Sequence, residues 1–398
     1  MSVDFVRYLA AKKTVDDRAL NRPVWQALLA ALPRVTMERP LRVVEAGAGI
    51  GTMVERALAW GLPADTHYTA LDQSAENVAA GRRRLLTLPP GFRLQWEVND
   101  FFDFAAGASP ASWDLLIAHA FLDLVDLETA LPLLLSLIRP GGLFYFSLNF
   151  DGGTIFQPAI DPAFDAEVEA LYHQTMDERL VGGRPSGDSR TGRHLFHRLR
   201  AAGAEVLAAG SSDWVVFADG DGNYPANEAT FLHFIVDTIS RALQGNPALD
   251  QARFSRWIAR RHTQIERGEL FYVAHQLDYL GRRPRGLDLF HPEQNDQDKL
   301  NRLVDQPHGS PDIGPVKDEV KNEGDGREQQ QQPADERALV LEHGRGPVEG
   351  AQQYQVADGI EDEGDAHGTT AGDTQNQVNQ RGSDGQDNDG KLQGAARG

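Results

Sequence analysis

The chain of 398 residues contains no cysteine. Disulfide bonds, thiol nucleophiles and zinc–thiolate sites are therefore excluded. It also lacks any apolar run near the roughly 18 residues that a membrane-spanning helix needs. The start M-S-V-D-F-V-R-Y places acidic and basic residues where a signal peptide requires an apolar core. These absences favour a cytoplasmic protein that does not enter a membrane.

Positive charge is scarce as well, with 39 Lys and Arg against 58 Asp and Glu and a formal net charge of −19. Because a nucleic-acid backbone calls for a basic surface, we expect no nucleic-acid partner. From Leu289 to the C-terminus there are 23 acidic and 10 basic residues, and Tyr354 is the only aromatic residue beyond Phe290. Such a segment buries too little apolar area to offset the entropy lost on ordering. We predict that residues 290–398 form a disordered acidic tail or are an out-of-frame extension.

A glycine-rich turn follows the first strand-like segment. Residues 41–51 read L-R-V-V-E-A-G-A-G-I-G: an apolar, β-branched run, then glycines at three alternate positions, with a helical pattern after them. A strand, a tight glycine turn and a helix N-terminus together form a nucleotide-binding turn. The third glycine comes one residue earlier than in the G-x-G-x-x-G fingerprint of dinucleotide-binding folds, which disfavours an NAD-dependent dehydrogenase.

An acidic residue closes the next predicted strand. Asp72 follows the segment 66–71, about 20 residues past the glycines, where a carboxylate can accept hydrogen bonds from both hydroxyls of a ribose. Asp72 could instead cap the helix that begins near Ser74. The sequence leaves both roles open.

The ends of the later predicted strands carry further polar residues. His119 closes the strand 113–118, either as a base or as a residue that packs and bonds the backbone. The remaining features are Asn99-Asp100-Phe101 after the strand 92–98, and an R-P-G-G turn between the helix 127–138 and the strand 143–149.

The order and spacing of these features resemble class I S-adenosylmethionine (SAM) dependent methyltransferases over roughly residues 40–150, and in the sheet pattern to about 284. The resemblance implies an α/β fold: a Rossmann-like, seven-stranded, mostly parallel sheet with helices on both faces. It implies SAM as cofactor, with Asp72 on the ribose, Asp100 on the adenine amino group and Phe101 on the adenine ring. The cofactor-binding residues implied are Glu45, Gly47, Ala48, Gly49, Gly51, Asp72, Gln73, Asn99, Asp100, Phe101 and His119.

The remaining pattern divides the chain into three parts. Residues 1–39 are predicted as an N-terminal helical cap, and 40–284 as the methyltransferase domain. An insertion at about 226–267 carries two amphipathic helices before a last, antiparallel strand at 270–280, and it is long enough to form a lid. His233 and His275 lie in apolar settings and are predicted to be structural. The tail from 290 is the third part.

The acceptor side is predicted after the fifth strand, at the edge of the sheet where open α/β folds bind ligands. The glycine loop 182–193 carries Arg184, Arg190 and Arg193, which could hold an anionic group in two-pronged fashion. Alternatively, Asp188 or Ser189 only caps the following helix.

These patterns predict transfer of a methyl group from SAM to an unidentified small-molecule acceptor, and the arginines favour an anionic one. Displacement at the sulfonium carbon of SAM depends mainly on alignment of the reactants, so no metal is expected. If the acceptor must lose a proton, His173, Asp151 or Asp188 could serve as base. The alternative is a non-catalytic SAM-binding module that recruits a protein partner. The sequence does not indicate an oligomeric state.

Overall fold

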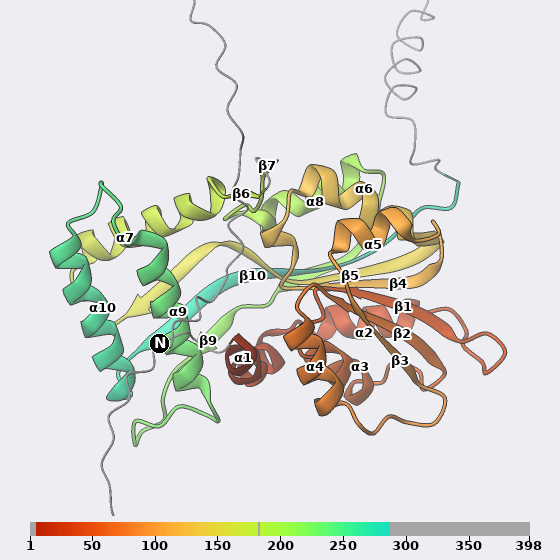
Figure 1. The fold of residues 1–398 in the computed structure, drawn as a ribbon, viewed down its shortest axis with the longest axis horizontal. Coiled ribbons are helices and arrows are strands. Elements are labelled where there is room, and N and C mark those ends of the chain that lie inside the picture. Colours follow the sequence, from red (N-terminus) through yellow and green to blue (C-terminus); the bar gives the residue numbers. More distant parts are fainter. Residues whose placement is uncertain (1–4, 182–183, 287–398) are drawn as a thin grey trace, which may run out of the picture. The chain divides into compact units, whose positions relative to one another are not determined.

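The computed structural model describes residues 5–181 and 184–286 (Figure 1). The predicted tail at 290–398, and Gly182 and Gly183 of the predicted acceptor loop, lie outside the described residues. Within the described part, a mixed sheet is covered on both faces by helices, as Figure 1 shows. The predicted Rossmann-like α/β fold is therefore confirmed.

The sheet has the strand order β3-β2-β1-β4-β5-β10-β8, and β9 also pairs with β10. The first five strands run parallel, and β10 runs antiparallel to β5, β8 and β9. Two separate strands, β8 and β9, each pair with β10, so the described sheet has eight strands rather than the predicted seven. The strands are β1 (Leu41–Ala46), β2 (Thr66–Asp72), β3 (Arg93–Val98), β4 (Trp113–His119), β5 (Ile138–Gln157), β8 (Glu205–Ser211), β9 (Trp214–Val216) and β10 (Phe271–Arg282).

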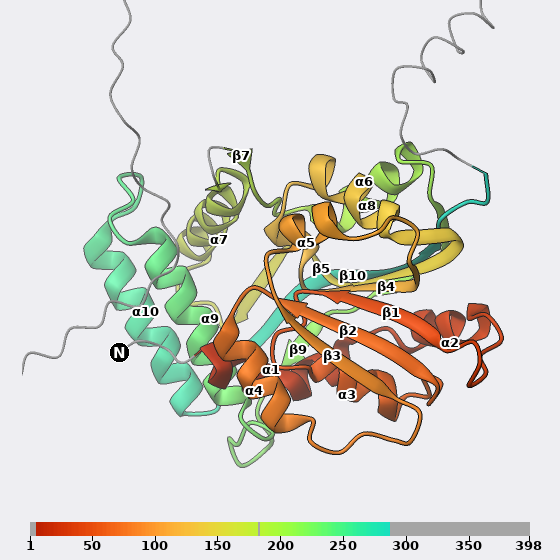
Figure 2. The same ribbon diagram turned by 45° about the vertical axis from the view of Figure 1, so that its right-hand side comes forward.

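Helices α5, α6 and α8 cover one face of the sheet, and α2, α3 and α4 cover the other (Figures 1 and 2). Several begin at a side chain that accepts a free backbone N–H, as Ser74 does for α4 and Asp126 for α6. The helices and short elements are α1 (Phe5–Ala19), α2 (Arg22–Ala31), α3 (Thr52–Ala59), α4 (Ala75–Arg84), α5 (Phe101–Gly107), η1 (Leu122–Leu124), α6 (Leu127–Leu137), α7 (Pro162–Asp177), the hairpin β6 (Leu180–Val181) and β7 (Arg184–Pro185), α8 (Thr191–Ala201), α9 (Glu228–Leu243) and α10 (Gln251–Glu266).

The packing of β4 explains why its sequence is apolar without alternation. Leu116 and Ala118 point into the core beneath α5 and α6, whereas Leu115 and Ile117 point into the core beneath α2 and α3. A parallel strand covered on both faces has no side for polar residues. His119 ends this apolar run and lies at the carboxyl edge of the sheet.

The fifth strand differs from the prediction. It was expected to end near Asn149, but β5 continues to Gln157, where it pairs with Phe271 of β10. This far segment, residues 150–157, runs beyond the parallel sheet to helices α7, α9 and α10, as Figure 2 shows. A third apolar core forms there, around Phe231, Trp257 and Tyr272. The predicted helical insertion is present as α9 and α10, and it packs on this extension.

Candidate functional site

The glycine turn after β1 has a backbone that only glycine adopts easily. Gly47, Gly49 and Gly51 all have positive φ, at 70°, 56° and 79°. A Cβ added to Gly47 would lie 2.8 Å from the Phe121 ring, and one added to Gly51 would lie 2.9 Å from Trp96. The turn therefore favours glycine at all three positions, and at Gly47 and Gly51 the close packing of an aromatic ring also leaves no room for a side chain.

Asp72 is bonded directly to this turn. Its Oδ2 accepts the Gly49 N–H at 2.8 Å, and its Oδ1 accepts the Ser74 N–H at 2.9 Å and the Asn77 side-chain amide at 3.1 Å. The helix α4 is capped by Ser74, not by Asp72. A carboxylate has about four acceptor sites, so Asp72 keeps capacity for a ligand. Gln73, which follows it, is exposed, and Ala48 of the turn is buried.

The residues after β3 begin a helix rather than a loop. Asp100 caps α5 and accepts the Phe102 N–H at 2.7 Å. Phe101 is buried and packs edge-on against Phe121, the ring that covers Gly47. Asn99 is exposed, and its backbone N–H bonds Asp72 O at 3.2 Å. The structure thus brings all three predicted residues to the same edge as the glycine turn, and their contacts with adenine stay a prediction.

Glu45 provides a test of whether this edge suits a ligand with donor groups. Its side chain is 1% exposed, and its Oε2 accepts the Tyr68 hydroxyl at 2.7 Å. Its Oε1 is buried and has no hydrogen-bond partner among the described residues. Burial raises the pKa of the Glu45 carboxyl to about 7. Such a group would be stabilised by a donor or a positive charge on a bound molecule, and the contact of Glu45 with a cofactor stays a prediction.

His119 is held on both sides by protein groups. Its Nδ1 lies 2.9 Å from Ser147 Oγ, and its Nε2 lies 3.1 Å from Arg56 Nη1 and 3.2 Å from Asp16 Oδ2. Burial lowers the pKa of His119 to about 4. A neutral ring with both nitrogens engaged links β4 to α1 and α3, so the alternative of a packed, hydrogen-bonded histidine fits the geometry better than a base.

The helix α1 covers the glycine turn. A Cβ added to Gly49 would lie 3.2 Å from Leu9, and Arg18 forms an ion pair with the buried Glu228 of α9. Lys12 bonds Asp16 at 2.9 Å and lies over the Trp214 ring. Figure 2 shows α1 between α4 and α9. The part of the predicted N-terminal cap formed by α1 therefore lies over the turn.

Two predicted acceptor residues are committed to each other. The Arg193 backbone N–H and Nε both donate to Asp151 Oδ1, at 2.6 and 2.8 Å, and Arg193 Nη2 donates to Asp151 O. His275 lies 2.8 Å from Asp213 and 3.6 Å from Asp151. The prediction that Arg193 is available to an anionic group is wrong in this arrangement. His275 pairs with carboxylates rather than lying in an apolar setting.

The prediction that Asp188 or Ser189 caps the following helix is wrong, because the N-cap of α8 is Arg190 and no side chain caps it. Asp188 accepts the Arg190 N–H at 2.8 Å and lies 2.6 Å from His194 Nδ1, and Ser189 donates to Asp177. His173 is half-buried and lies 3.0 Å from Thr154 Oγ1, and burial lowers its pKa. The Arg190 guanidinium has no hydrogen bond or ion pair within the described part of the chain, and its Cγ lies near Gly152. His233, predicted to be structural, stacks on His262 at a ring distance of 5.0 Å.

One polar residue at this edge was missed by the sequence analysis. Asp123 lies in η1, two residues after Phe121, and its Oδ1 is buried without a partner among the described residues. The signal available in the sequence was an acid directly behind the apolar run of β4. It was masked by the apolar neighbours Leu122 and Leu124, which made the segment resemble core.

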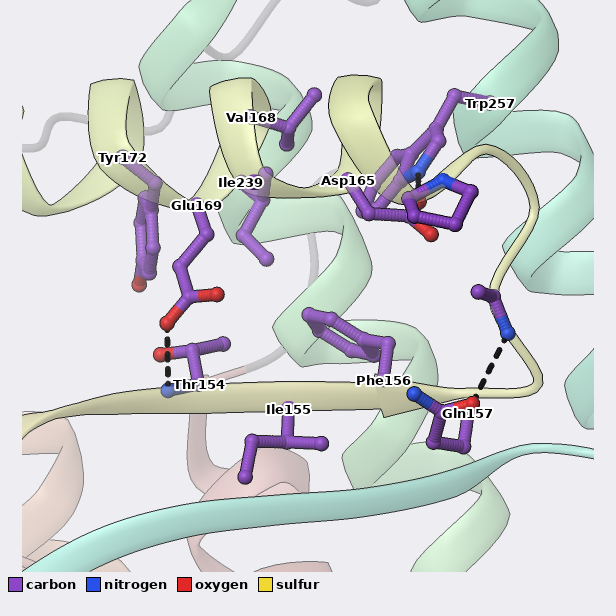
Figure 3. A pocket seen from close by; sticks show the side chains of 13 residues that line it. Thr154, Ile155, Phe156, Gln157, Asp165, Val168, Glu169, Tyr172, Ile239 and Trp257 are labelled. Carbon is purple, nitrogen blue, oxygen red and sulfur yellow. Dashed lines mark hydrogen bonds between the residues drawn. The ribbon is translucent and has the colours of Figure 1, made fainter.

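A separate pocket of about 210 Å³ lies at the far segment of β5, between α7 and α10 (Figure 3). Phe156 and Trp257 line it, and Glu169 accepts the Thr154 N–H at 3.1 Å. Asp165 is committed to Trp257 and Arg261. No group of three or more potential metal ligands is present among the residues described, and no described helix is long and apolar enough to cross a bilayer.

The strand order and the glycine turn after β1 define a Rossmann-like domain with a ligand edge at the ends of β1, β2 and β4. Residues 43–142 match the family model of the methyltransferase domain. A stretch of 202 residues is 28% identical to the ubiquinone/menaquinone biosynthesis C-methyltransferase UbiE of Methylobacterium nodulans, covering 49% of this chain and 72% of that protein. The domain match and this relative bear out the predicted resemblance to SAM-dependent methyltransferases, and the cofactor that they indicate is SAM.

Solved structures with a similar arrangement include two whose sequences are distant. The YcgJ protein from Bacillus subtilis is 13% identical, over 66% of this chain and 98% of its own, with a TM-score of 0.39. A putative sarcosine dimethylglycine methyltransferase from Galdieria sulphuraria is 12% identical, over 65% of this chain and 82% of its own, with a TM-score of 0.35.

Proposed function

We propose that this protein transfers the methyl group of SAM to a small-molecule acceptor at the carboxyl edge of the sheet. The observation that carries the proposal is the Gly49–Asp72 bond, which joins the glycine turn after β1 to the acid at the end of β2. SAM supplies an electrophilic methyl group on a sulfonium with a good leaving group, so alignment of the acceptor supplies much of the catalysis.

The roles of the chain's own residues follow from their positions. Asp72 accepts a hydrogen bond from the ribose at its remaining acceptor site, and Asp100, whose Oδ1 caps α5, offers its other oxygen to the adenine amino group. Phe101 packs against the adenine ring from the side of the core, and Glu45 faces the ammonium group of SAM. The alternative of a non-catalytic module that recruits a protein has no support from the described residues or from the comparisons.

Calorimetric titration tests the cofactor assignment. S-adenosylhomocysteine and SAM should bind, and NAD should not. Replacing Asp72 with Ala should weaken binding of S-adenosylhomocysteine by about 1.5–3 kcal/mol for each charge-assisted bond lost. Asp103→Ala, an exposed acid in the first turn of α5, is the matched control and should bind as the unsubstituted protein does. Tighter binding of NAD, or an Asp72→Ala variant with full affinity, would overturn the assignment.

The acceptor is proposed to carry an anionic group that Arg190 holds. Arg190 is exposed, has no partner within the described part of the chain, and lies over Gly152 of β5, close enough to His173 to lower its pKa. An arginine binds a carboxylate or phosphate with two parallel hydrogen bonds, which lysine cannot reproduce.

Arg190→Lys should therefore raise the acceptor KM several-fold and leave the affinity for S-adenosylhomocysteine unchanged. Arg200→Lys, an exposed position on the same helix, serves as control. Methyl transfer from radiolabelled SAM into fractions of a metabolite extract provides the assay. Equal KM values for Arg190→Lys and the unsubstituted enzyme would show that the anionic group is held elsewhere or absent.

A further inference from the structure

The short helix η1 places Asp123 beside the cofactor turn. Phe121, which precedes η1, packs so closely on Gly47 that a Cβ there would lie 2.8 Å from its ring. Asp123 follows Phe121 by two residues, directly after the strand whose end faces the glycine turn. The helix η1 therefore lies at the same edge of the sheet as the glycine turn.

The backbone of η1 is fixed from outside. Arg179 Nη2 donates to Asp123 O at 3.0 Å, and Ser186 Oγ donates to Leu124 O at 2.8 Å. Both donors come from the segment that joins α7 to α8. Because two carbonyls of this short helix are held by a separate element, the backbone that carries Asp123 is fixed in place.

The hydrogen bonding of the Asp123 carboxyl is incomplete. Asp123 Oδ1 is buried and has no hydrogen-bond partner among the described residues. Two cations lie near: Lys12 of α1 is bonded to Asp16, and Arg179 is bonded to backbone carbonyls. The ring of Tyr8, also on α1, lies close enough that Asp123 raises its pKa. Burial raises the pKa of the Asp123 carboxyl, opposed by its own backbone N–H and by Arg179 and Lys12.

An unpaired buried carboxyl is destabilising, and in natural proteins each such group calls for an explanation. Asp123 lies after β4, two residues past the ring that packs on Gly47 of the glycine turn. We propose that Asp123 is a catalytic residue whose Oδ1 accepts a hydrogen bond, and then the proton, from the nucleophile of the acceptor. The acceptor is therefore a hydroxyl or an amine. This inference rests on the proposed function and names the chemistry of its acceptor.

The step balances without a further reactant. The oxygen or nitrogen lone pair of the acceptor forms the bond to the methyl carbon, and the electrons of the broken carbon–sulfur bond stay on sulfur. The proton of the acceptor O–H or N–H passes to Asp123 Oδ1 and from there to solvent when the product leaves. Tyr8 and Lys12 belong to α1, the helix that also lies on Gly49 through Leu9.

The variant Asp123→Asn tests the role with little change in shape. With methyl-tritiated SAM and a metabolite extract, we expect incorporation of label to fall roughly 100-fold or more, as for loss of a general base. The dissociation constant of S-adenosylhomocysteine should stay within about threefold. In the unsubstituted enzyme the rate should rise with pH and level off, and this rise should be absent in Asp123→Asn. Asp126→Asn is the control, because asparagine caps a helix as well as aspartate does.

A second measurement needs no acceptor. Because the folded carboxyl has a raised pKa, the folded state holds a proton that the unfolded state releases, so its stability contribution is present at low pH and is lost as pH rises through the folded pKa. The melting temperature of Asp123→Asn should therefore exceed that of the unsubstituted protein at pH 8, and the gap should shrink toward pH 4. A carboxylate with a purely structural role predicts the reverse: a variant that is less stable at pH 8.

The outcomes distinguish failure of the role of Asp123 from failure of the proposed methyltransferase function. Full labelling by Asp123→Asn, or a labelled product that carries the methyl group on carbon or sulfur, would overturn the role of Asp123 and leave the methyltransferase function standing. Absence of labelling by the unsubstituted enzyme would contradict the proposed function, and this inference with it.

Discussion

The carboxyl edge and the far segment of β5 are both built around a buried arginine, but the two arginines are bonded differently. Arg56, at the edge, uses all its donors: it bonds Asp16, Asp17, Thr52 and the Lys13 carbonyl, and it contacts His119. Arg261, at the extension, bonds Asp165, Gln264 and the Pro158 carbonyl, and its Nε has no partner among the described residues.

The difference shows what each cluster does in the fold. The Arg56 cluster joins α1 to α3 and β4, and so it holds the helix that covers the glycine turn. The Arg261 cluster joins α10 to α7 and to the loop after β5, and it lies among the aromatic rings Phe156 and Trp257. The first cluster therefore couples stability to the ligand edge, whereas the second supports the extension alone. Variants of the two arginines test this contrast.

The largest effect is expected for Arg56→Ala. Removing one partner of a buried ion pair leaves an uncompensated charge, here on Asp16, and typically costs about 3–5 kcal/mol. Urea unfolding should show this loss of free energy of unfolding. Since α1 is no longer held over Gly49, the affinity for S-adenosylhomocysteine should fall as well.

Arg83→Ala is the control, because Arg83 is exposed on α4 and should change stability by less than about 0.5 kcal/mol. An Arg56→Ala protein that loses stability but binds the ligand normally would show that α1 is not needed at the edge.

A smaller effect is expected for Arg261→Ala. Its partner Asp165 keeps an 18% exposed side chain, which water can partly solvate. The loss should therefore lie near the lower end of the range for buried pairs, about 3 kcal/mol. Binding of S-adenosylhomocysteine should be unchanged at temperatures where the variant is folded, with Arg260→Ala, an exposed neighbour on α10, as control. Weakened binding would show that the Arg261 cluster also supports the ligand edge, so that the two regions would not differ in this respect.

The same contrast explains how much of the fold could be predicted from the sequence. The edge depends on local patterns: alternate glycines, an acid at the end of a strand, and a continuous apolar run such as 113–118. These are short-range signals, and the strands that they predict at 66–71, 92–98 and 113–118 are present as β2, β3 and β4. The continuation of β5 to Gln157 depends on pairing with β10, more than 100 residues later. No local pattern carries such a contact, so the extension was missed.

The candidate site divides in the same way. Gly49 and Asp72 were found because their spacing is fixed by the strand–turn–helix unit, and the structure bonds them to each other. Whether an arginine can bind an anionic ligand depends on the groups that contact it in the folded chain. Arg193 is bound by Asp151, 42 residues earlier, and only the folded chain shows this. The unpartnered Oδ1 of Asp123 is likewise a property of its surroundings, not of its sequence neighbours.

The smallest predicted effect concerns Glu45 and is a pH dependence. Burial raises the pKa of the Glu45 carboxyl to about 7 in the folded protein. The folded state thus holds a proton that the unfolded state releases, and the stability that this proton contributes is lost as pH rises from the ordinary carboxyl pKa to about 7. The Glu45→Gln variant lacks this loss.

Ligand binding should shift the same proton. If the ammonium of S-adenosylhomocysteine lies near Glu45, it favours the carboxylate, and binding releases the proton. Affinity should then be roughly tenfold weaker at pH 6 than at pH 8, a difference of about 1.4 kcal/mol, and calorimetry in buffers of different ionisation enthalpy should detect proton release near pH 6.5. In Glu45→Gln both effects should vanish. Equal pH dependence in the two proteins would mean that Glu45 does not face the ammonium, and that its unpartnered Oε1 reflects the packing around Tyr68 rather than the cofactor.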